Sequence, residues 1–249
     1  MSIVKIDKKI HYCWFGSKPK PEAVLKYIEG WREKLPNYEI IEWNESNFDI
    51  NICEYVRQAH EAKKYAFVSD YARLLALYNH GGVYLDTDVE VCKDLGPLLD
   101  TGILTLGFEE FDFIATSTII APKKSKFIKY FLDSYNSRLF IESDGSLNQK
   151  TNVQVITNLL ENIGLIRNGI NQKLNFNGET IKILEQSLLS PFDYSNYIDN
   201  SDSSTYTIHH FGQSWADSKS IRNRRIKNII TSVIGGRGLR YLRKILNIF

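Results

Sequence analysis

The order of strand-like and helix-like segments in the first third of the chain restricts its fold more than any other feature. Residues 10–15 (IHYCWF), 38–43 (YEIIEW) and 81–91 (GGVYLDTDVEV) are rich in the β-branched and aromatic residues of strands. Residues 21–35 and 55–79 have the apolar spacing of helices. A β-α-β-α-β order implies a parallel or mixed sheet covered by helices, with ligands at the carboxyl ends of the strands. We therefore expect an α/β fold with its functional site at that edge.

The rest of the chain is less regular, and no internal repeat or Pro/Gly-rich linker divides it before residue 216. Strands are expected in LTLGFEE (104–110), FIATSTIIA (113–121) and TYTIHHF (205–211), and helices in residues 124–135 and 152–164. We expect one domain over residues 1–215 and a separate tail over residues 216–249.

Composition places the chain among ordinary globular proteins. It has 249 residues, of which 43% are hydrophobic and 24% charged, enough to bury a full core. Its three cysteines, Cys13, Cys53 and Cys92, form no CxxC pair, so neither a disulfide framework nor a zinc site is indicated. The N-terminus lacks the apolar core of a signal peptide, and no run approaches the ~20 apolar residues of a spanning helix. These features predict a cytoplasmic protein.

The net charge of +2 hides a basic C-terminal tail. From Ala216 onward nine Lys and Arg face one acid, Asp217. Residues 226–234 and 242–249 each carry an apolar stripe at helical spacing beside the basic residues. We interpret the first stripe as packing on the domain. The second fits attachment to an anionic membrane surface, and nucleic acid fits less well because the apolar stripe would be unused. The expected location is the inner face of the cell membrane, as a peripheral protein.

Two carboxylates, Asp86 and Asp88, interrupt the strand-like run at residues 81–91. In an extended segment residues i and i+2 point to the same face, so both side chains aim at one spot. Like charges held this close repel each other, and a site that keeps both ionised usually contains a cation. The pair therefore predicts a site for a hard divalent metal ion.

Polar side chains elsewhere are candidates for the same site. Asp70 and Arg73 share one side of a helix. Such a pair is commonly a surface ion pair of little energetic weight, but this helix leads directly through Gly81 and Gly82 into the aspartate-bearing strand. We therefore expect the pair to lie near the strand end.

Aromatic and imidazole groups occur in two short motifs, HYCWFG near the N-terminus and HHFGQSW at residues 209–215. Trp14 of the first motif is either a core residue or a stacking platform for a flat ring. In the second motif, imidazole can ligate a metal and indole can cover a sugar or base.

The motifs HYCWFG, SDYARL, GGVYLDTD and HHFGQSW, in this order and at roughly this spacing, resemble glycosyltransferase family 32. This family includes capsular polysaccharide and α-mannosyl transferases, and the chain is also similar to the catalytic domain of the large clostridial glucosylating toxins. The resemblance runs from about Lys9 to Trp215, and its ordered set of motifs is more specific than the short DxD. It implies a GT-A fold, a nucleotide-sugar donor, a Mn²⁺ or Mg²⁺ ion and transfer with retention of anomeric configuration.

The resemblance also implies roles for individual residues in donor binding. Trp14 would pack on the nucleotide base, while Asp70 and Arg73 would hold the donor sugar and its phosphate. Asp86 would face the ribose and sugar, and Asn152 falls where a sugar-binding or acceptor-side asparagine is found.

The closing segment and the metal ligands follow in the same way. Ser214 and Trp215 would close over the diphosphate, and Asp88 would ligate the metal directly, with Asp86 beside it. Where the toxins have a glutamate before this segment, the chain has His209 and His210, and we expect His210 to be the third ligand.

The expected activity is transfer of a hexose from a UDP-sugar, or from GDP-mannose, to a saccharide acceptor that can be lipid-linked. Synthesis of capsule, O-antigen or exopolysaccharide is the setting that the resemblance implies. A toxin-like transferase that modifies protein and a non-catalytic carbohydrate-binding protein are the alternatives. A metal-dependent hydrolase fits less well, because its DxD pair normally follows the first strand whereas this pair follows the third.

Overall fold

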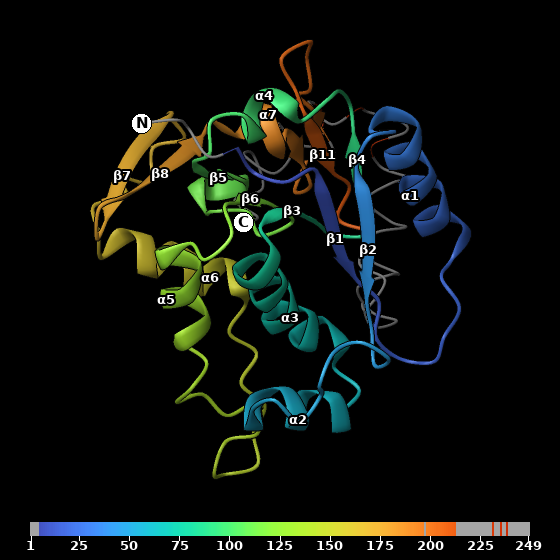
Figure 1. Cartoon of the computed structure of the whole chain (residues 1–249), viewed down its shortest axis with the longest axis vertical. Helices are drawn as coiled ribbons and strands as arrows, with labels where there is room; N and C mark the ends of the chain where they lie inside the picture. The colour runs from blue at the N-terminus through green and yellow to red at the C-terminus, as the bar shows by residue number, and fades with distance from the viewer. Residues whose placement is uncertain (1–4, 197, 213–230, 232–234, 236–237, 239–249) are drawn as a thin grey trace.

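The computed structural model describes residues 5–196 and 198–212, together with residues 231, 235 and 238. Its centre is a seven-stranded mixed sheet in the order β2-β1-β3-β6-β5-β8-β7 (Figure 1). The strands of this sheet are β1 (Lys9–Cys13), β2 (Glu39–Trp43), β3 (Gly82–Leu85), β5 (Leu104–Gly107), β6 (Thr118–Ala121), β7 (Gln172–Phe176) and β8 (Glu179–Leu184). Two small antiparallel pairs lie outside it, β4 (Val89–Val91) with β11 (Thr207–His209) and β9 (Phe192–Asp193) with β10 (Ile198–Asp199).

Helices cover both faces of the sheet. They are α1 (Glu22–Lys34), α2 (Glu54–Glu61), α3 (Tyr65–His80), α4 (Gly96–Leu99), α5 (Lys126–Asp133), α6 (Asn152–Glu161) and α7 (Gln186–Leu189), with a 3₁₀ turn η1 at Glu110–Asp112. One core contains side chains of α2, α3, α5 and α6, and the other contains side chains of α1, α4 and α7. The helices are labelled in Figure 1. The α/β class with a mixed sheet and flanking helices is thereby confirmed.

Successive side chains of a strand point to opposite faces of the sheet and so belong to different cores. In β3, Tyr84 belongs to the core beneath α3, while Val83 and Leu85 belong to the opposite core. Local signals set the ends of several helices. At the start of α6, for example, Thr151 and Gln154 form a reciprocal capping box that satisfies backbone N–H groups of the first turn.

Strand directions place the carboxyl ends of five strands at one edge of the sheet. β1 runs parallel to β2 and β3, and β5 runs parallel to β8. β6 is antiparallel to both β3 and β5, so these two strands share a direction. Thr116 and Ser117, which precede β6, therefore lie at the same edge as the residues that follow β3 and β5.

Residues 81–91, expected to form one short strand that the two aspartates interrupt, form two strands, and the expectation that both aspartates lie in extended backbone is wrong. β3 ends at Leu85, and a turn closed by the Val89 N–H donating to the Asp86 carbonyl (3.0 Å) separates it from β4. β4 then leaves the main sheet and pairs with β11. The two aspartates consequently lie in a turn at the sheet edge, and their proximity comes from the turn rather than from strand alternation.

Several predictions concern residues outside the described part of the chain. Ser214, Trp215, the boundary at residue 216 and the two tail helices lie there, because only residues 231, 235 and 238 of the tail are described. Among the described helices, none combines the length and apolar character that crossing a bilayer would need.

Candidate functional site

Paired glycines deliver the chain from α3 into β3 and so set the position of the aspartate turn. Gly81 has a φ of +66°, and a Cβ atom there would lie 2.7 Å from the backbone nitrogen of Lys123. Only glycine tolerates both the backbone angle and the close approach. At the other end of β3, the Asp86 N–H donates to the Ser117 carbonyl (2.8 Å), which fixes the turn against β6.

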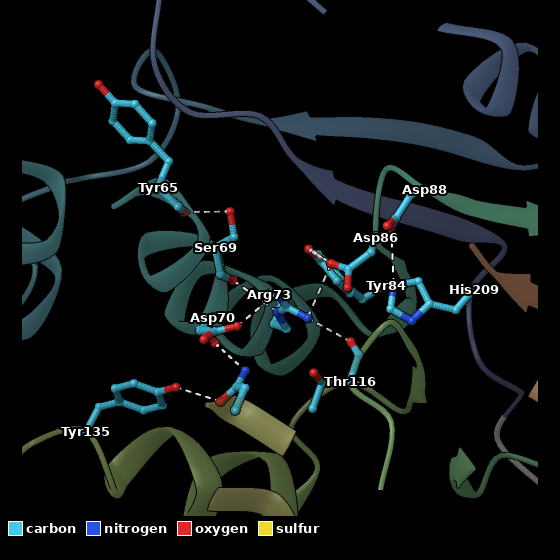
Figure 2. A network of polar contacts seen from close by, with 11 residues as sticks. Tyr65, Ser69, Asp70, Arg73, Tyr84, Asp86, Asp88, Thr116, Tyr135 and His209 are labelled. Atoms are coloured by element: carbon cyan, nitrogen blue, oxygen red, sulfur yellow. Dashed lines mark hydrogen bonds and ion pairs between the residues drawn. The ribbon is translucent and has the colours of Figure 1, made fainter. Parts of the chain in front are cut away.

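Strand β11 brings a histidine to this turn. Its pairing places His209 opposite Val89, and the His210 N–H donates to the Asp88 carbonyl (3.0 Å). His209 Nε2 then lies 3.3 Å from Asp88 Oδ1 (Figure 2). Asp86, Asp88 and His209 each offer one ligand atom, and these three atoms lie within 4.8 Å of one another.

The charges of Asp88 and His209 depend on each other. Burial opposes ionisation of Asp88, but the charge of His209 and its hydrogen bond outweigh this effect and lower the pKa of the carboxyl to about 2. Burial likewise disfavours the imidazolium, but Asp88 outweighs it and raises the pKa of His209 to about 9. At neutral pH the two residues therefore form an ion pair, with a proton on the ring between the carboxylates.

This donor set fits a divalent cation. Carboxylate oxygens suit Mg²⁺ and Mn²⁺, and imidazole is a common additional ligand for transition ions. His209 Nδ1 is buried and has no hydrogen-bond partner among the described residues, while Nε2 faces the carboxylates. A cation held by Asp86, Asp88 and His209 would take the place of the ring proton as the positive charge between the two aspartates.

Arg73 connects this turn to helix α3. Its Nη2 lies 3.0 Å from Asp70 Oδ1 and its Nη1 lies 3.3 Å from Asp86 Oδ1. Nη1 also donates to the Thr116 carbonyl (2.8 Å), and Nε donates to the Ser69 carbonyl (3.2 Å) (Figure 2). The guanidinium is buried, so these contacts form in a setting of low dielectric constant.

Protein groups surround the Arg73 guanidinium on several sides. All three guanidinium nitrogens contact protein oxygens, and the Tyr84 ring covers the group at 4.5 Å. The Tyr84 hydroxyl also donates to Asp86 Oδ1 (2.8 Å). Arg73 and Tyr84 together hold the Asp86 carboxylate in place. The geometry supports a positioning role for Arg73 toward Asp86, and the contact with the donor phosphate that the resemblance implied stays a prediction.

Asp70 and Asn152 continue this network away from the turn. Asn152 Nδ2 donates to the Asp70 carbonyl (3.2 Å), and Asn152 Oδ1 accepts from the Tyr135 hydroxyl (2.6 Å). Burial raises the pKa of the Asp70 carboxyl to about 6, although Arg73 opposes the shift. Asn152 is itself buried, so its side chain ties α6 to α3.

The remaining predicted residues lie in different places. Trp14 follows β1 at the same sheet edge, where its indole N–H donates to the Lys18 carbonyl (2.9 Å). His210 points to the opposite face of β11 from His209: its Nε2 lies 2.8 Å from Glu90 Oε2, and its ring stacks on Tyr27. Since neighbouring residues of a strand face opposite sides, His209 replaces His210 as the candidate third ligand.

Sequence reasoning overlooked Glu109, which follows β5 at the site edge. Burial raises the pKa of its carboxyl to about 7, with His209 opposing the shift and Asp86 adding to it. Its neighbour Glu110 is engaged elsewhere, because it accepts hydrogen bonds from the backbone N–H and hydroxyl of Ser195. The sequence signal was the FEE segment at the end of an expected strand, where a ligand site was already expected.

Residues 21–105 match the family described as "Glycosyltransferase sugar-binding region containing DXD motif". This stretch contains Asp70, Arg73, Asp86 and Asp88. The resemblance to DXD glycosyltransferases is confirmed. The mixed sheet with flanking helices agrees with the α/β class that this resemblance implied.

The chain is similar to two curated proteins and to a solved structure. The chain is 32% identical over 112 residues to Subversion of eukaryotic traffic protein A of Legionella pneumophila, a match covering 34% of this chain and 17% of that protein. It is 31% identical over 113 residues to an uncharacterized glycosyltransferase of Acanthamoeba polyphaga mimivirus. That match covers 42% of this chain and 44% of the viral protein. The chain thus spans less than half of either relative. Among solved structures, PaToxG glycosyltransferase is 22% identical with a TM-score of 0.49, over 64% of this chain and 70% of that one.

Proposed function

We propose that the protein is a metal-dependent glycosyltransferase that uses a nucleotide-sugar donor. The observation that carries this proposal is the convergence of Asp86, Asp88 and His209 within a DXD-containing sugar-binding region. A non-catalytic carbohydrate-binding protein would need stacking aromatic rings, but it would not need two carboxylates and an imidazole around a common point.

Different residues of the site are proposed to bind different parts of the donor. Asp86, Asp88 and His209 would hold a Mn²⁺ or Mg²⁺ ion, which would supply Lewis-acid stabilisation of the departing diphosphate. Arg73 and Tyr84 keep the Asp86 carboxylate oriented. Trp14, at the carboxyl end of β1, is the proposed platform for the nucleotide base.

Asp70 is proposed to accept hydrogen bonds from hydroxyl groups of the donor sugar, with Asn152 holding the backbone of Asp70 in position. Ser214 and Trp215 remain proposed residues of the segment that closes over the diphosphate.

We propose substitution with retention. The acceptor oxygen attacks the anomeric carbon on the face from which the phosphate leaves, and the electron pair of the broken C–O bond goes to the diphosphate. The acceptor proton passes to a donor phosphate oxygen. Asp70 and Asp86 contact hydroxyl groups in this scheme, and neither is used as a covalent nucleophile.

We propose that the enzyme transfers a hexose from a UDP-sugar to a saccharide acceptor. GDP-mannose is the second candidate donor. We place the enzyme in polysaccharide synthesis, with a lipid-linked acceptor at the inner membrane surface reached through the basic tail. Removal of the chain from Gly235 onward is expected to lower sedimentation with anionic vesicles at low salt and to leave donor hydrolysis intact. Undiminished sedimentation of the shortened protein would contradict the membrane role.

Hydrolysis of UDP- and GDP-sugars with Mn²⁺ tests the activity without knowledge of the acceptor. The wild-type protein should release nucleoside diphosphate from at least one donor, and EDTA should abolish the release. Asp88→Ala should have the same effect as EDTA, because it removes both a metal ligand and the partner of His209. Turnover that persists in EDTA would contradict metal dependence.

A protein acceptor is the second candidate. The match to Subversion of eukaryotic traffic protein A supports it, since that name describes action on a eukaryotic process. Incubation of the enzyme and a radiolabelled donor with a eukaryotic cell extract, followed by proteinase treatment, separates the two acceptors. Protease-sensitive label supports a protein acceptor, and protease-resistant glycan label supports a saccharide.

A further inference from the structure

Glu109 occupies the sheet edge beside the candidate metal residues. It follows β5 after Phe108, and β5 runs in the same direction as β3, which ends just before Asp86. Only β6 separates these two strands, so their axes lie roughly 10 Å apart. The backbone of Glu109 is anchored, because its N–H donates to the Phe113 carbonyl (2.8 Å).

The carboxyl group of Glu109 is unpaired within the described part of the chain. No described side chain or backbone group forms a hydrogen bond or an ion pair with it, although the charges of His209 and Asp86 reach it. Glu110 differs in this respect, because Ser195 donates two hydrogen bonds to its carboxylate. A partly buried carboxyl that the fold leaves without a partner is available to a ligand.

The position of Glu109 along the sheet indicates which part of a donor would meet it. Trp14 follows β1, on one side of β3, whereas Glu109 follows β5, on the other side. A nucleotide-sugar with its base at Trp14 and its diphosphate at Asp86 and Asp88 would extend its sugar toward β5. Glu109 lies on that side of the metal residues.

We propose that Glu109 is a specificity-determining residue that accepts a hydrogen bond from a hydroxyl group of the transferred sugar. This inference rests on the proposed function. A carboxyl group that depends on one sugar hydroxyl discriminates against donors that lack it or carry it in the other configuration, because the group is then left without a partner. A divalent cation at the neighbouring site favours the carboxylate form, which accepts the stronger hydrogen bond.

Calorimetric titration in the presence of Mn²⁺ tests this assignment. UDP, UDP-glucose, UDP-galactose, UDP-N-acetylglucosamine, GDP and GDP-mannose are titrated into wild-type protein to find the preferred donor. The measured quantity is the ratio of the dissociation constant of the free nucleotide to that of its sugar conjugate. In Glu109→Ala and the isosteric Glu109→Gln, this ratio should fall, by about tenfold in the alanine variant.

Two controls separate sugar contact from other effects. Affinity for Mn²⁺ alone and for the free nucleotide should stay within about twofold of wild type in both variants. Glu110→Gln should leave the ratio unchanged, because its carboxylate already has a partner in Ser195.

An unchanged ratio in both Glu109 variants overturns the assignment. An equal loss of affinity for the free nucleotide or for Mn²⁺ also overturns it, because the residue would then act through the metal centre. A wild-type protein that binds none of the six ligands contradicts the proposed function and this inference with it. Wild-type binding combined with an unaffected Glu109→Ala variant contradicts the inference alone.

Discussion

Replacement of Arg73 by lysine should disrupt the centre of the site while keeping its positive charge. The guanidinium contacts Asp70, Asp86 and the carbonyls of Ser69 and Thr116 from three nitrogens. A lysine ammonium is a point charge on a flexible stem and cannot reproduce these directions at once. Hydrogen bonds involving a charged group contribute about 1.5–3 kcal/mol each, and breaking a buried pair costs about 3–5 kcal/mol. With one carboxylate contact retained, we expect a loss of about 2–4 kcal/mol in the free energy of unfolding.

Thermal unfolding measures this loss directly. For a domain of this size, about 2–4 °C of melting temperature corresponds to 1 kcal/mol, so Arg73→Lys should melt roughly 5–15 °C below wild type. Arg57→Lys is the matched control, because Arg57 also contacts two carboxylates, Glu54 and Glu61, but on the exposed surface of α2. Its melting temperature should stay close to wild type.

Donor hydrolysis should fall at least about tenfold in Arg73→Lys, since Asp86 loses its fixed orientation. Equal melting temperatures for the two lysine variants would show that the buried network does not hold the site together.

Two further perturbations test the surroundings of the site. Burial raises the pKa of Asp70 to about 6, above the pKa near 4 of an aspartate in the unfolded chain. The folded protein therefore binds this proton more tightly, and the resulting stabilisation is complete below about pH 4 and is lost as pH rises through 6. In EDTA, Asp70→Asn should therefore gain about 2–3 kcal/mol relative to wild type between pH 4 and pH 7, and parallel stability curves would contradict the shift. Gly82→Ala should reduce the free energy of unfolding by about 2–3 kcal/mol, because Gly82 has a φ of +105° and an added Cβ would lie 2.7 Å from the Lys9 carbonyl oxygen. Gly30→Ala, at an open position in α1, should raise the free energy of unfolding by about 0.5–1 kcal/mol. Chemical denaturation measures both changes, and the same sign for the two variants would contradict the role given to backbone angle and close approach at Gly82.

Local patterns predicted the first half of the sheet. Residues 10–15, 21–35 and 38–43 correspond to β1, α1 and β2, and in β1 and α1 most apolar residues of the pattern are buried. The expected helical region at residues 55–79 became α2 and α3. The turn after β3 was missed, because the valines of β4 resemble a continuation of the strand and only the pairing with β11 shows otherwise.

One missed element did have a local signal. The hairpin of β7 and β8 turns at Asn177 and Gly178, a dipeptide typical of tight two-residue hairpins. Asn177 has a φ of +51° and Gly178 a φ of +82°, as such a turn requires. The two-residue strands β9 and β10 are too short to have a recognisable period, so sequence patterns could not have predicted them.

The part of the site that depends on local sequence spacing could be predicted. The i, i+2 aspartates and the helical Asp70–Arg73 spacing are local features, and the structure joins them in one network. The choice between His209 and His210 depended on how β11 pairs with β4, a contact between residues about 120 positions apart. Arg73 also donates a hydrogen bond to the backbone carbonyl of Thr116, and no pattern of side chains in the sequence reveals such a contact.

Mn²⁺ titration of His209→Ala and His210→Ala tests the central claim most directly. The claim is that Asp86, Asp88 and His209 form the metal site of a sugar transferase. His209→Ala should weaken Mn²⁺ binding by about tenfold or more and should weaken Mn²⁺-dependent binding of the preferred nucleotide-sugar in parallel. His210→Ala should leave both within about twofold of wild type, because its ring pairs with Glu90 and stacks on Tyr27. Unaltered Mn²⁺ affinity in His209→Ala, or a larger loss in His210→Ala, would contradict this account of the site.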